Sequence, residues 1–165
     1  MDRKPSVCIV MGSKSDLPTM EQTMAMLKEF DVPYEVRILS AHRTPKETLQ
    51  LSEEAAQRGI KVFIAGAGGA AHLAGVIASS TILPVIGVPM QTSALGGMDS
   101  LLSIVQMPQG VPVATTAIGN AGAKNAAILA VQIMALSDEA LAAKLTNFKK
   151  AQAEKVLADS HWDNR

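Results

Sequence analysis

Runs of apolar residues and amphipathic repeats alternate along the chain. The first apolar run, residues 6–11, has no alternating polar face and is typical of a strand buried in a parallel sheet. Residues 17–30 then repeat apolar side chains at helical spacing, with one face formed by Leu17, Met20, Met24 and Leu27. A strand and a helix follow each other five times in this way. This alternation predicts an α/β fold with a doubly wound parallel sheet, covered by helices on both faces.

The same patterns predict the remaining elements. Further strands are expected at residues 34–39, 62–65, 85–88 and 113–116. Helices are expected at residues 45–58, about 76–80, 99–106, 121–136 and from 139 onward. No repeat or linker interrupts the alternation, so residues 1–165 are expected to form one domain.

Turn residues mark where two of these helices begin. The sequence predicts Thr44 as the capping residue of the helix at residues 45–58 and Pro45 as its first helical position. Glu47 is expected to be the acidic residue that bonds back to the cap. Asp16 or Ser15 is expected to cap the helix that starts at residue 17.

The helix at residues 121–136 is small and apolar on nearly every side. A single chain of this length would find it hard to bury all of those sides, so the pattern favours packing between identical subunits. The last helix is amphipathic, and the tail after Leu157 is polar apart from Trp162.

Composition narrows the classes of function. The chain carries 15 basic and 15 acidic side chains and only 3% aromatic residues, which argues against a nucleic-acid partner. Its longest nearly uniform apolar run, residues 126–136, is too short to cross a bilayer, and no signal-peptide pattern precedes the first strand. The one cysteine, Cys8, is expected to be a buried and unreactive thiol. These features indicate a cytoplasmic protein without a membrane partner.

Polar side chains gather in three turns that each follow a predicted strand. The turns span residues 12–16, 40–44 and 66–72, and they supply Ser13, Ser15, Asp16, Ser40, His42, Arg43 and His72. Carboxyl ends of parallel strands meet at one edge of a sheet, where ligands of open α/β folds bind. We therefore expect these side chains to surround one site.

The residue types suit a phosphorylated sugar. Ser13 and Ser15 lie at a helix start, where backbone amides favour an anion, and Arg43 adds a fixed positive charge. Asp16 would accept hydrogen bonds from ribose hydroxyls. His42, next to Arg43, is the candidate proton-transfer group, and nothing resembles the turn of a covalent nucleophile.

Simpler interpretations of the same residues stay open. Asp16 would then be only a helix cap, the serines only turn residues, and His72 only a side chain that lines the pocket. His161 is expected to lie in a solvated tail. A metal site of His42, His72 and Asp16 matches no metal-binding spacing, so no metal is expected.

The glycine-rich residues 66–71 fit a relaxed form of the dinucleotide-binding fingerprint. However, they follow the third strand, and no acidic residue lies about twenty positions further on to hold a ribose. The glycines therefore favour close approach of the backbone to something small.

Four motifs in this order resemble a known family. They are Met11-Gly12-Ser13-Lys14-Ser15-Asp16, Ser40-Ala41-His42-Arg43-Thr44-Pro45, Gly66-Ala67-Gly68-Gly69-Ala70-Ala71-His72-Leu73 and Asp99-Ser100-Leu101-Leu102-Ser103-Ile104-Val105-Gln106-Met107-Pro108. With them the chain resembles the class I bacterial N5-carboxyaminoimidazole ribonucleotide mutases, also called catalytic subunits of phosphoribosylaminoimidazole carboxylase. The likeness runs from about Val7 to the last helix.

The resemblance implies a flavodoxin-like, three-layer fold and an octamer of identical subunits, with the C-terminal helices used in oligomer packing. It implies an isomerase of purine biosynthesis that needs no ATP, metal or organic cofactor. The substrate would be N5-carboxyaminoimidazole ribonucleotide. Its carboxylate would move from the exocyclic nitrogen to ring carbon 4, through carbon dioxide that stays trapped.

The resemblance also implies a role for each matching residue. His42 would shuttle protons and Asp16 would bind the ribose hydroxyls. The phosphate would be bound around Gly12 by Ser13, Ser40 and Arg43. The transferred carboxylate would be enclosed by the loop that contains Ala67, Gly68, Gly69, His72 and Leu73.

Two residues depart from the family's usual pattern, and two other functions stay open. Ala74 stands where proline is usual and Gln109 where glycine is usual, which affects loop rigidity rather than chemistry. A carboxylase of the same family, which takes free carbon dioxide, is expected to have lysine where this chain has Arg43. A non-catalytic nucleotide- or flavin-binding module would have no need of His42 beside Arg43.

Overall fold

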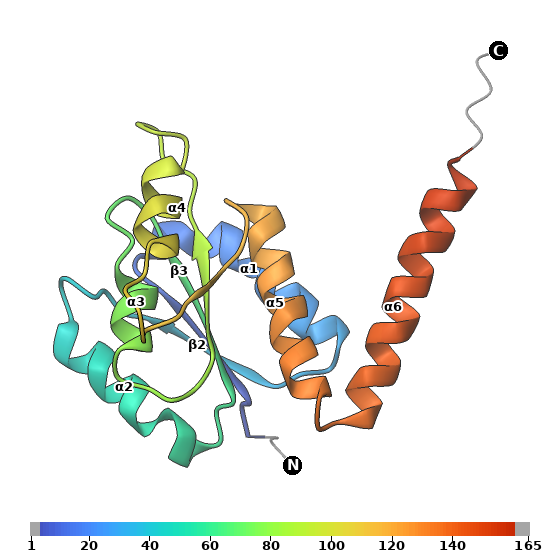
Figure 1. The fold of residues 1–165 in the computed structure, drawn as a ribbon, viewed down its shortest axis with the longest axis horizontal. Coiled ribbons are helices and arrows are strands. Elements are labelled where there is room, and N and C mark those ends of the chain that lie inside the picture. The colour runs from blue at the N-terminus through green and yellow to red at the C-terminus, as the bar shows by residue number, and fades with distance from the viewer. Residues whose placement is uncertain (1–3, 161–165) are drawn as a thin grey trace.

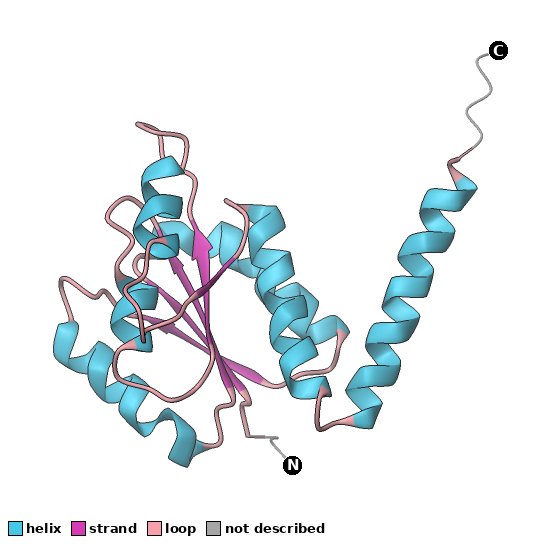
Figure 2. Cartoon of the chain, in the orientation of Figure 1, coloured by secondary structure: helices cyan, strands magenta, loops and turns pink. Residues whose placement is uncertain are grey.

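The computed structural model describes residues 4–160, in which five parallel strands lie between two layers of helices (Figure 2). The strands are β1 (Val7–Met11), β2 (Tyr34–Ile38), β3 (Val62–Ala67), β4 (Val85–Pro89) and β5 (Ala114–Thr115). Their order in the sheet is β2-β1-β3-β4-β5, and every pairing is parallel. This order is that of the flavodoxin-like doubly wound fold, so the predicted fold class is confirmed.

Helices cover both faces of this sheet (Figure 1). One layer consists of α1 (Leu17–Glu29) and α5 (Asn120–Ala135). The other consists of α2 (Pro45–Arg58), α3 (Leu73–Ala78) and α4 (Met98–Val105). Each layer encloses its own hydrophobic core, and the central strands separate the two.

Strand β1, between β2 and β3, is buried along its whole length, as its apolar run predicted. Val7, Ile9 and Met11 point into the core under α1 and α5. Cys8 and Val10 point into the other core, because successive side chains of a strand face opposite ways. Burial raises the pKa of the Cys8 thiol far above its ordinary value, and the nearby Glu35 carboxylate acts in the same direction. Cys8 is therefore a protonated core residue, as expected.

Strand β3 continues two residues beyond its predicted end at residue 65. Gly66 pairs with Met11 and Ala67 pairs with Pro89. Glycine fits here without displacing its neighbours, whereas a Cβ at position 66 would lie 2.6 Å from Met20 Sδ and 2.7 Å from Met90 Cε, so the ends of both methionine side chains would have to shift. The prediction treated Gly66 as the start of a turn, whereas crowding by two methionines is the reason for it.

One side of helix α5 is buried within its own chain. Its buried residues in the described structure are Gly122, Ala123, Ala126, Ala127, Ala130, Val131 and Met134. They face α1 and the sheet, since small side chains let the helices approach closely. The other sides are exposed or only partly buried, with Ile128, Leu129 and Ile133 among the partly buried residues, so the expected packing between subunits stays a prediction.

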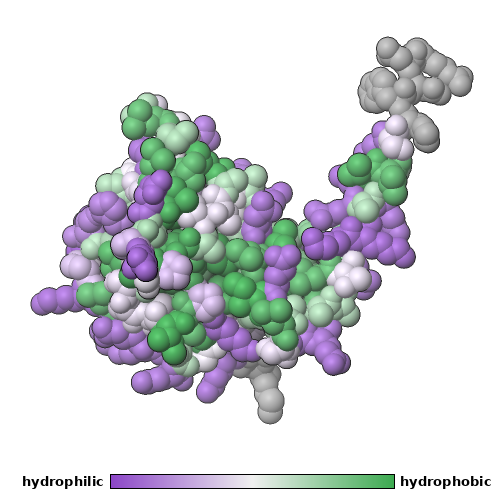
Figure 3. All heavy atoms as spheres, viewed as in Figure 1, coloured by the Kyte–Doolittle hydropathy of each residue, from purple (hydrophilic) through white to green (hydrophobic). Residues whose placement is uncertain are grey.

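The last helix, α6 (Glu139–Ala158), extends away from the rest of the chain (Figure 1). Its base is held by Leu145, which is buried, and by Phe148, whose ring meets the edge of Phe30 at a centroid distance of 5.3 Å. Val156 and Leu157 at its far end are 69% and 66% exposed, and apolar surface also covers α4 (Figure 3).

His161 and Trp162 lie outside the described residues. Across residues 4–160, no helix combines the length and the apolar character needed to cross a membrane.

Candidate active site

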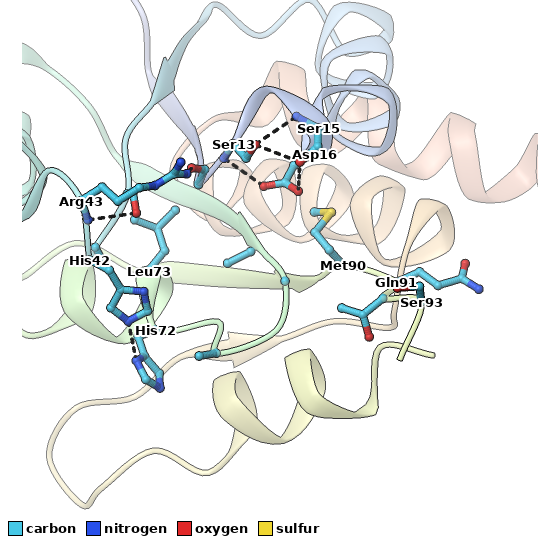
Figure 4. A pocket seen from close by; sticks show the side chains of 17 residues that line it. Ser13, Ser15, Asp16, His42, Arg43, His72, Leu73, Met90, Gln91 and Ser93 are labelled. Atoms are coloured by element: carbon cyan, nitrogen blue, oxygen red, sulfur yellow. Dashed lines mark hydrogen bonds between the residues drawn. The ribbon is translucent and has the colours of Figure 1, made fainter. Parts of the chain in front are cut away.

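A cavity of about 580 Å³ opens at the carboxyl edge of the sheet (Figure 4). All three predicted turns contribute to its wall, as expected from the parallel strand order. Among the predicted site residues, those that line it are Gly12, Ser13, Asp16, Ser40, His42, Arg43, Ala67, Gly68, His72 and Leu73. Gly69 does not line the cavity, because its backbone bonds to α4 behind the loop.

A fourth turn completes the wall and was not assigned to the site from the sequence. Met90, Gln91, Thr92 and Ser93 follow β4 and line the same cavity as the other three turns (Figure 4). Their position directly after a strand was the signal that could have identified them, since every such turn reaches the same edge.

The first turn is closed by a reciprocal hydrogen-bond pair. The hydroxyl of Ser13 accepts from the Ser15 amide at 3.3 Å, and the carboxylate of Asp16 accepts from the Ser13 amide at 3.2 Å. These bonds cap a 3₁₀ turn, Lys14–Asp16, that precedes α1. Asp16 occupies the predicted N-cap position of α1, but its side chain makes no capping bond to that helix, because the carboxylate accepts from the Ser13 amide instead.

Asp16 remains able to accept further hydrogen bonds from a ligand. Burial raises the pKa of its carboxyl group, while hydrogen bonds from Ser13 and Ser15 and the charge of Arg43 act to lower it. A carboxylate in this partly desolvated setting gains more from hydroxyl donors than one in bulk water.

The second turn is held by Thr44 and Ser40. The Thr44 hydroxyl accepts from the Ser40 amide at 2.8 Å and donates to the Ser40 carbonyl at 3.1 Å. The Ser40 hydroxyl in turn accepts from the Arg43 amide at 3.2 Å. Thr44 and Pro45 occupy the predicted N-cap and first helical positions of α2, but the side-chain bonds of a capping box are absent, since the Thr44 hydroxyl is used to close its own turn.

Arg43 joins the first two turns. Its Nη2 donates to the carbonyl oxygen of Gly12 at 2.8 Å, which places the guanidinium beside Ser13 (Figure 4). A smaller hollow of about 290 Å³ lies against the cavity, and Arg43, Ser13 and Ser40 line both. Lys14 lines this hollow as well, so it presents two cationic side chains to a ligand.

His42 and His72 are in direct contact across the cavity wall. Nε2 of His42 lies 2.8 Å from Nδ1 of His72, and the rings meet edge to face at a centroid distance of 4.9 Å. A contact of this length requires one hydrogen between the two nitrogens, so one ring donates and the other accepts. The sequence placed both residues in the site, but their contact joins two separate turns and was not predicted.

Within residues 4–160, no three His, Cys, Asp or Glu side chains come together where they could hold a metal ion. Neither of the two departures from the family pattern lines the cavity. Ala74 is buried in α3, and Gln109 is exposed in the loop before β5.

Comparison with known proteins agrees with this geometry. The AIR carboxylase family model matches residues 6–155 of the chain. The N5-carboxyaminoimidazole ribonucleotide mutase of Bacillus subtilis (strain 168) is 58% identical over 157 residues, covering 95% of this chain and 97% of that relative. The corresponding mutase of Escherichia coli (strain K12) is 54% identical over 151 residues, covering 92% of this chain and 89% of that relative.

A solved structure extends the likeness to three dimensions. The crystal structure of Treponema denticola PurE superposes with a TM-score of 0.87 at 31% identity, covering 98% of this chain and 99% of that one. Family match, sequence identity and structural likeness span nearly all of the chain. The chain belongs to the AIR carboxylase family.

Proposed function

We propose that this chain is an isomerase of purine biosynthesis that converts N5-carboxyaminoimidazole ribonucleotide into 4-carboxy-5-aminoimidazole ribonucleotide. The observation that carries the proposal is the presence of His42 and Arg43 in one cavity. The imidazole can transfer protons, and the neighbouring guanidinium is held by the Gly12 carbonyl in a position where it can bind an anion. Relatives at 54–58% identity bear the mutase name.

The phosphate of the substrate is placed in the hollow shared by Ser13, Ser40 and Arg43. Two cationic side chains, Arg43 and Lys14, face this hollow, and Arg43 is preorganised by its bond to Gly12. Asp16 lies at the inner side of the same turn, where it would accept hydrogen bonds from ribose hydroxyls. The aminoimidazole ring then extends toward His42 and the glycine-rich turn.

The reaction exchanges one bond for another at the ring. The bond between the exocyclic nitrogen and the carboxylate carbon breaks, which releases carbon dioxide inside the cavity. Ring carbon 4 attacks this carbon dioxide, carbon 4 loses a proton and the exocyclic nitrogen gains one. His42 carries that proton. Its contact with His72 gives the imidazole a hydrogen-bond partner, so that His42 can take up a proton at one ring nitrogen while it releases one at the other.

The released carbon dioxide has no covalent hold, so the walls must retain it. Ala67, Gly68 and Ala70 present small side chains and backbone to this part of the cavity. Confinement of this kind gives carbon dioxide a very high effective concentration beside ring carbon 4. This chemistry requires no step through a metal or organic cofactor, and we assign none.

We also propose that the chain forms a homo-octamer in the cytoplasm. The apolar side chains exposed on α4 and at the far end of α6 support association, because α6 extends beyond the body of its own chain (Figure 3). A single free thiol, buried in β1, suits a reducing compartment.

Replacing His42 with asparagine should remove turnover while leaving binding of the ribonucleotide nearly unchanged. Asparagine keeps similar size and some hydrogen bonding but cannot carry the proton, which typically costs a factor of roughly a hundred or more. Steady-state rates and ligand titration measure the two effects separately. Near-normal turnover in His42→Asn would remove His42 from the mechanism.

Replacing Arg43 with alanine should weaken binding of the ribonucleotide by about 1.5–3 kcal/mol, the usual contribution of a charged hydrogen bond. Arg37→Ala is the matched control, because Arg37 lies on β2 and pairs with Glu35 away from the cavity. Calorimetric titration of both variants tests the assignment. Equal affinity in the two variants would show that Arg43 does not hold the phosphate.

The carboxylate carbon of the product should come from the carboxylate of the substrate and not from the buffer. If trapped carbon dioxide recombines faster than it escapes, isotope-labelled bicarbonate in the buffer will barely enter the product. The measurement is the product mass after one turnover of the N-carboxylated ribonucleotide. Extensive labelling, without exchange into the substrate, would instead favour the carboxylase that uses free carbon dioxide.

Sedimentation at micromolar concentration should show a species about eight times the 17.3 kDa mass of one chain. The expected reason is burial of the apolar surface on α4 and α6 between subunits. A species of one chain's mass at that concentration would contradict the octamer.

A further inference from the structure

We propose that Ser100 and Ser103 of α4 are positioning residues that hold the glycine-rich turn closed over the transferred carboxylate. This inference rests on the proposed function and adds two residues to it that lie outside the cavity wall. It starts from Gly69, whose neighbours Gly68 and Ala70 line the cavity while Gly69 itself does not.

Gly69 determines how its two neighbours face the cavity. Its φ of +68° lies in the left-handed region, which glycine adopts without steric cost. A Cβ at Gly68 would lie 3.2 Å from Met90 Cβ, so the turn already approaches the fourth wall of the cavity closely. A change of conformation at Gly69 would therefore move the part of the wall nearest the reacting carboxylate.

Both polar backbone groups of Gly69 are bonded to one face of α4. The amide donates to Ser100 Oγ at 3.0 Å. The carbonyl lies 3.2 Å from Ser103 Oγ, whose one hydrogen is shared with the Asp99 carbonyl at 2.7 Å, and it also accepts from the Ala71 amide at 2.8 Å. Serines three positions apart lie on the same helix face, so a single helix contacts both the amide and the carbonyl of Gly69. Ser100 is completely buried, which withdraws this contact from competition with water.

Helix α4 is itself fixed to the protein at both ends. Thr92 bonds to Asp99 at 2.7 Å through its hydroxyl, which also accepts from the Gly97 amide at 3.1 Å. Near the other end, Ile104 is completely buried against β4. Because Thr92 belongs to the cavity wall, α4 connects the third turn to the fourth.

This arrangement matters for a step in which carbon dioxide is free. An ionic clamp cannot hold a neutral molecule, so its retention depends on how tightly the small-residue wall is closed. If the turn opens, carbon dioxide escapes, the exocyclic nitrogen takes a proton, and uncarboxylated ribonucleotide is released instead of product. Loosening the grip on Gly69 should thus change which product forms, and not only how fast.

The test compares the partition between these two products in Ser100→Ala, Ser103→Ala and the double variant. Each variant is given the N-carboxylated ribonucleotide, and both ribonucleotides are quantified after subtraction of the enzyme-free decarboxylation. Loss of one hydrogen bond should raise the uncarboxylated fraction about twofold to tenfold, and the double variant should exceed either single one. The KM for the substrate should change little, because the phosphate and ribose contacts lie on other turns.

Two controls separate positioning from general damage. Ser79→Ala removes an exposed hydroxyl at the end of α3 that bonds only to its own helix in the described structure, and it should leave the partition unchanged. Ser103→Thr keeps the hydroxyl and should restore the wild-type partition.

Each outcome decides a different point. A lower kcat with an unchanged partition in Ser100→Ala and Ser103→Ala would overturn the positioning role. If Ser100→Ala fails to fold, the comparison of Ser103→Ala with Ser103→Thr decides alone. Failure of the wild-type protein to form any product would overturn the proposed function itself, which is a distinguishable result.

Discussion

Burial of β1 on both faces fixes where the site can form. Its last residue, Met11, is paired with Ile38 on one side and Gly66 on the other. Neighbouring strands lie only about 4.8 Å apart, so the three turns that follow must start side by side. The ladder even continues past the strands, since the Gly12 amide donates to Gly66 and the Leu39 amide donates to Met11. Loss of this interior strand would separate the turns and remove the cavity.

The polar groups of the cavity bond to one another before any ligand arrives. Ser13 and Asp16 cap the same turn, Arg43 is held by Gly12, and His42 is held by His72. Long side chains such as arginine lose much rotational freedom when they bind a ligand. Because that freedom is already restricted here, a ligand meets groups that need little further ordering.

The sequence predicted what depends on local pattern and on strand order. Apolar runs located the strands, and polar residues after them located the cavity, because parallel strands send every turn to one edge. Predictions failed where the surroundings of a side chain depend on the folded shape of the chain rather than on the local sequence pattern. Gly66 was interpreted as a turn residue because its crowding by Met20 and Met90 arises only in the folded chain and cannot be seen in the local sequence. Thr44 lies at the predicted N-cap position, but its hydroxyl bonds to the Ser40 backbone instead of to the helix, and that choice depends on the shape of the turn.

Charge is divided unequally around the cavity, and the division matches the parts of the proposed substrate. The ionised side chains, Asp16 and Arg43, come from the first and second turns. Beyond the histidine pair, the third and fourth turns supply only small or neutral residues such as Gly68, Ala70 and Met90. A fixed positive charge beside the carboxylate would stabilise the anionic carbamate of the substrate more than the neutral carbon dioxide that it releases. Such a charge would therefore slow cleavage of the bond. A neutral wall, closed by backbone and held from behind by α4, avoids that penalty and leaves His42 at the boundary where the proton must move.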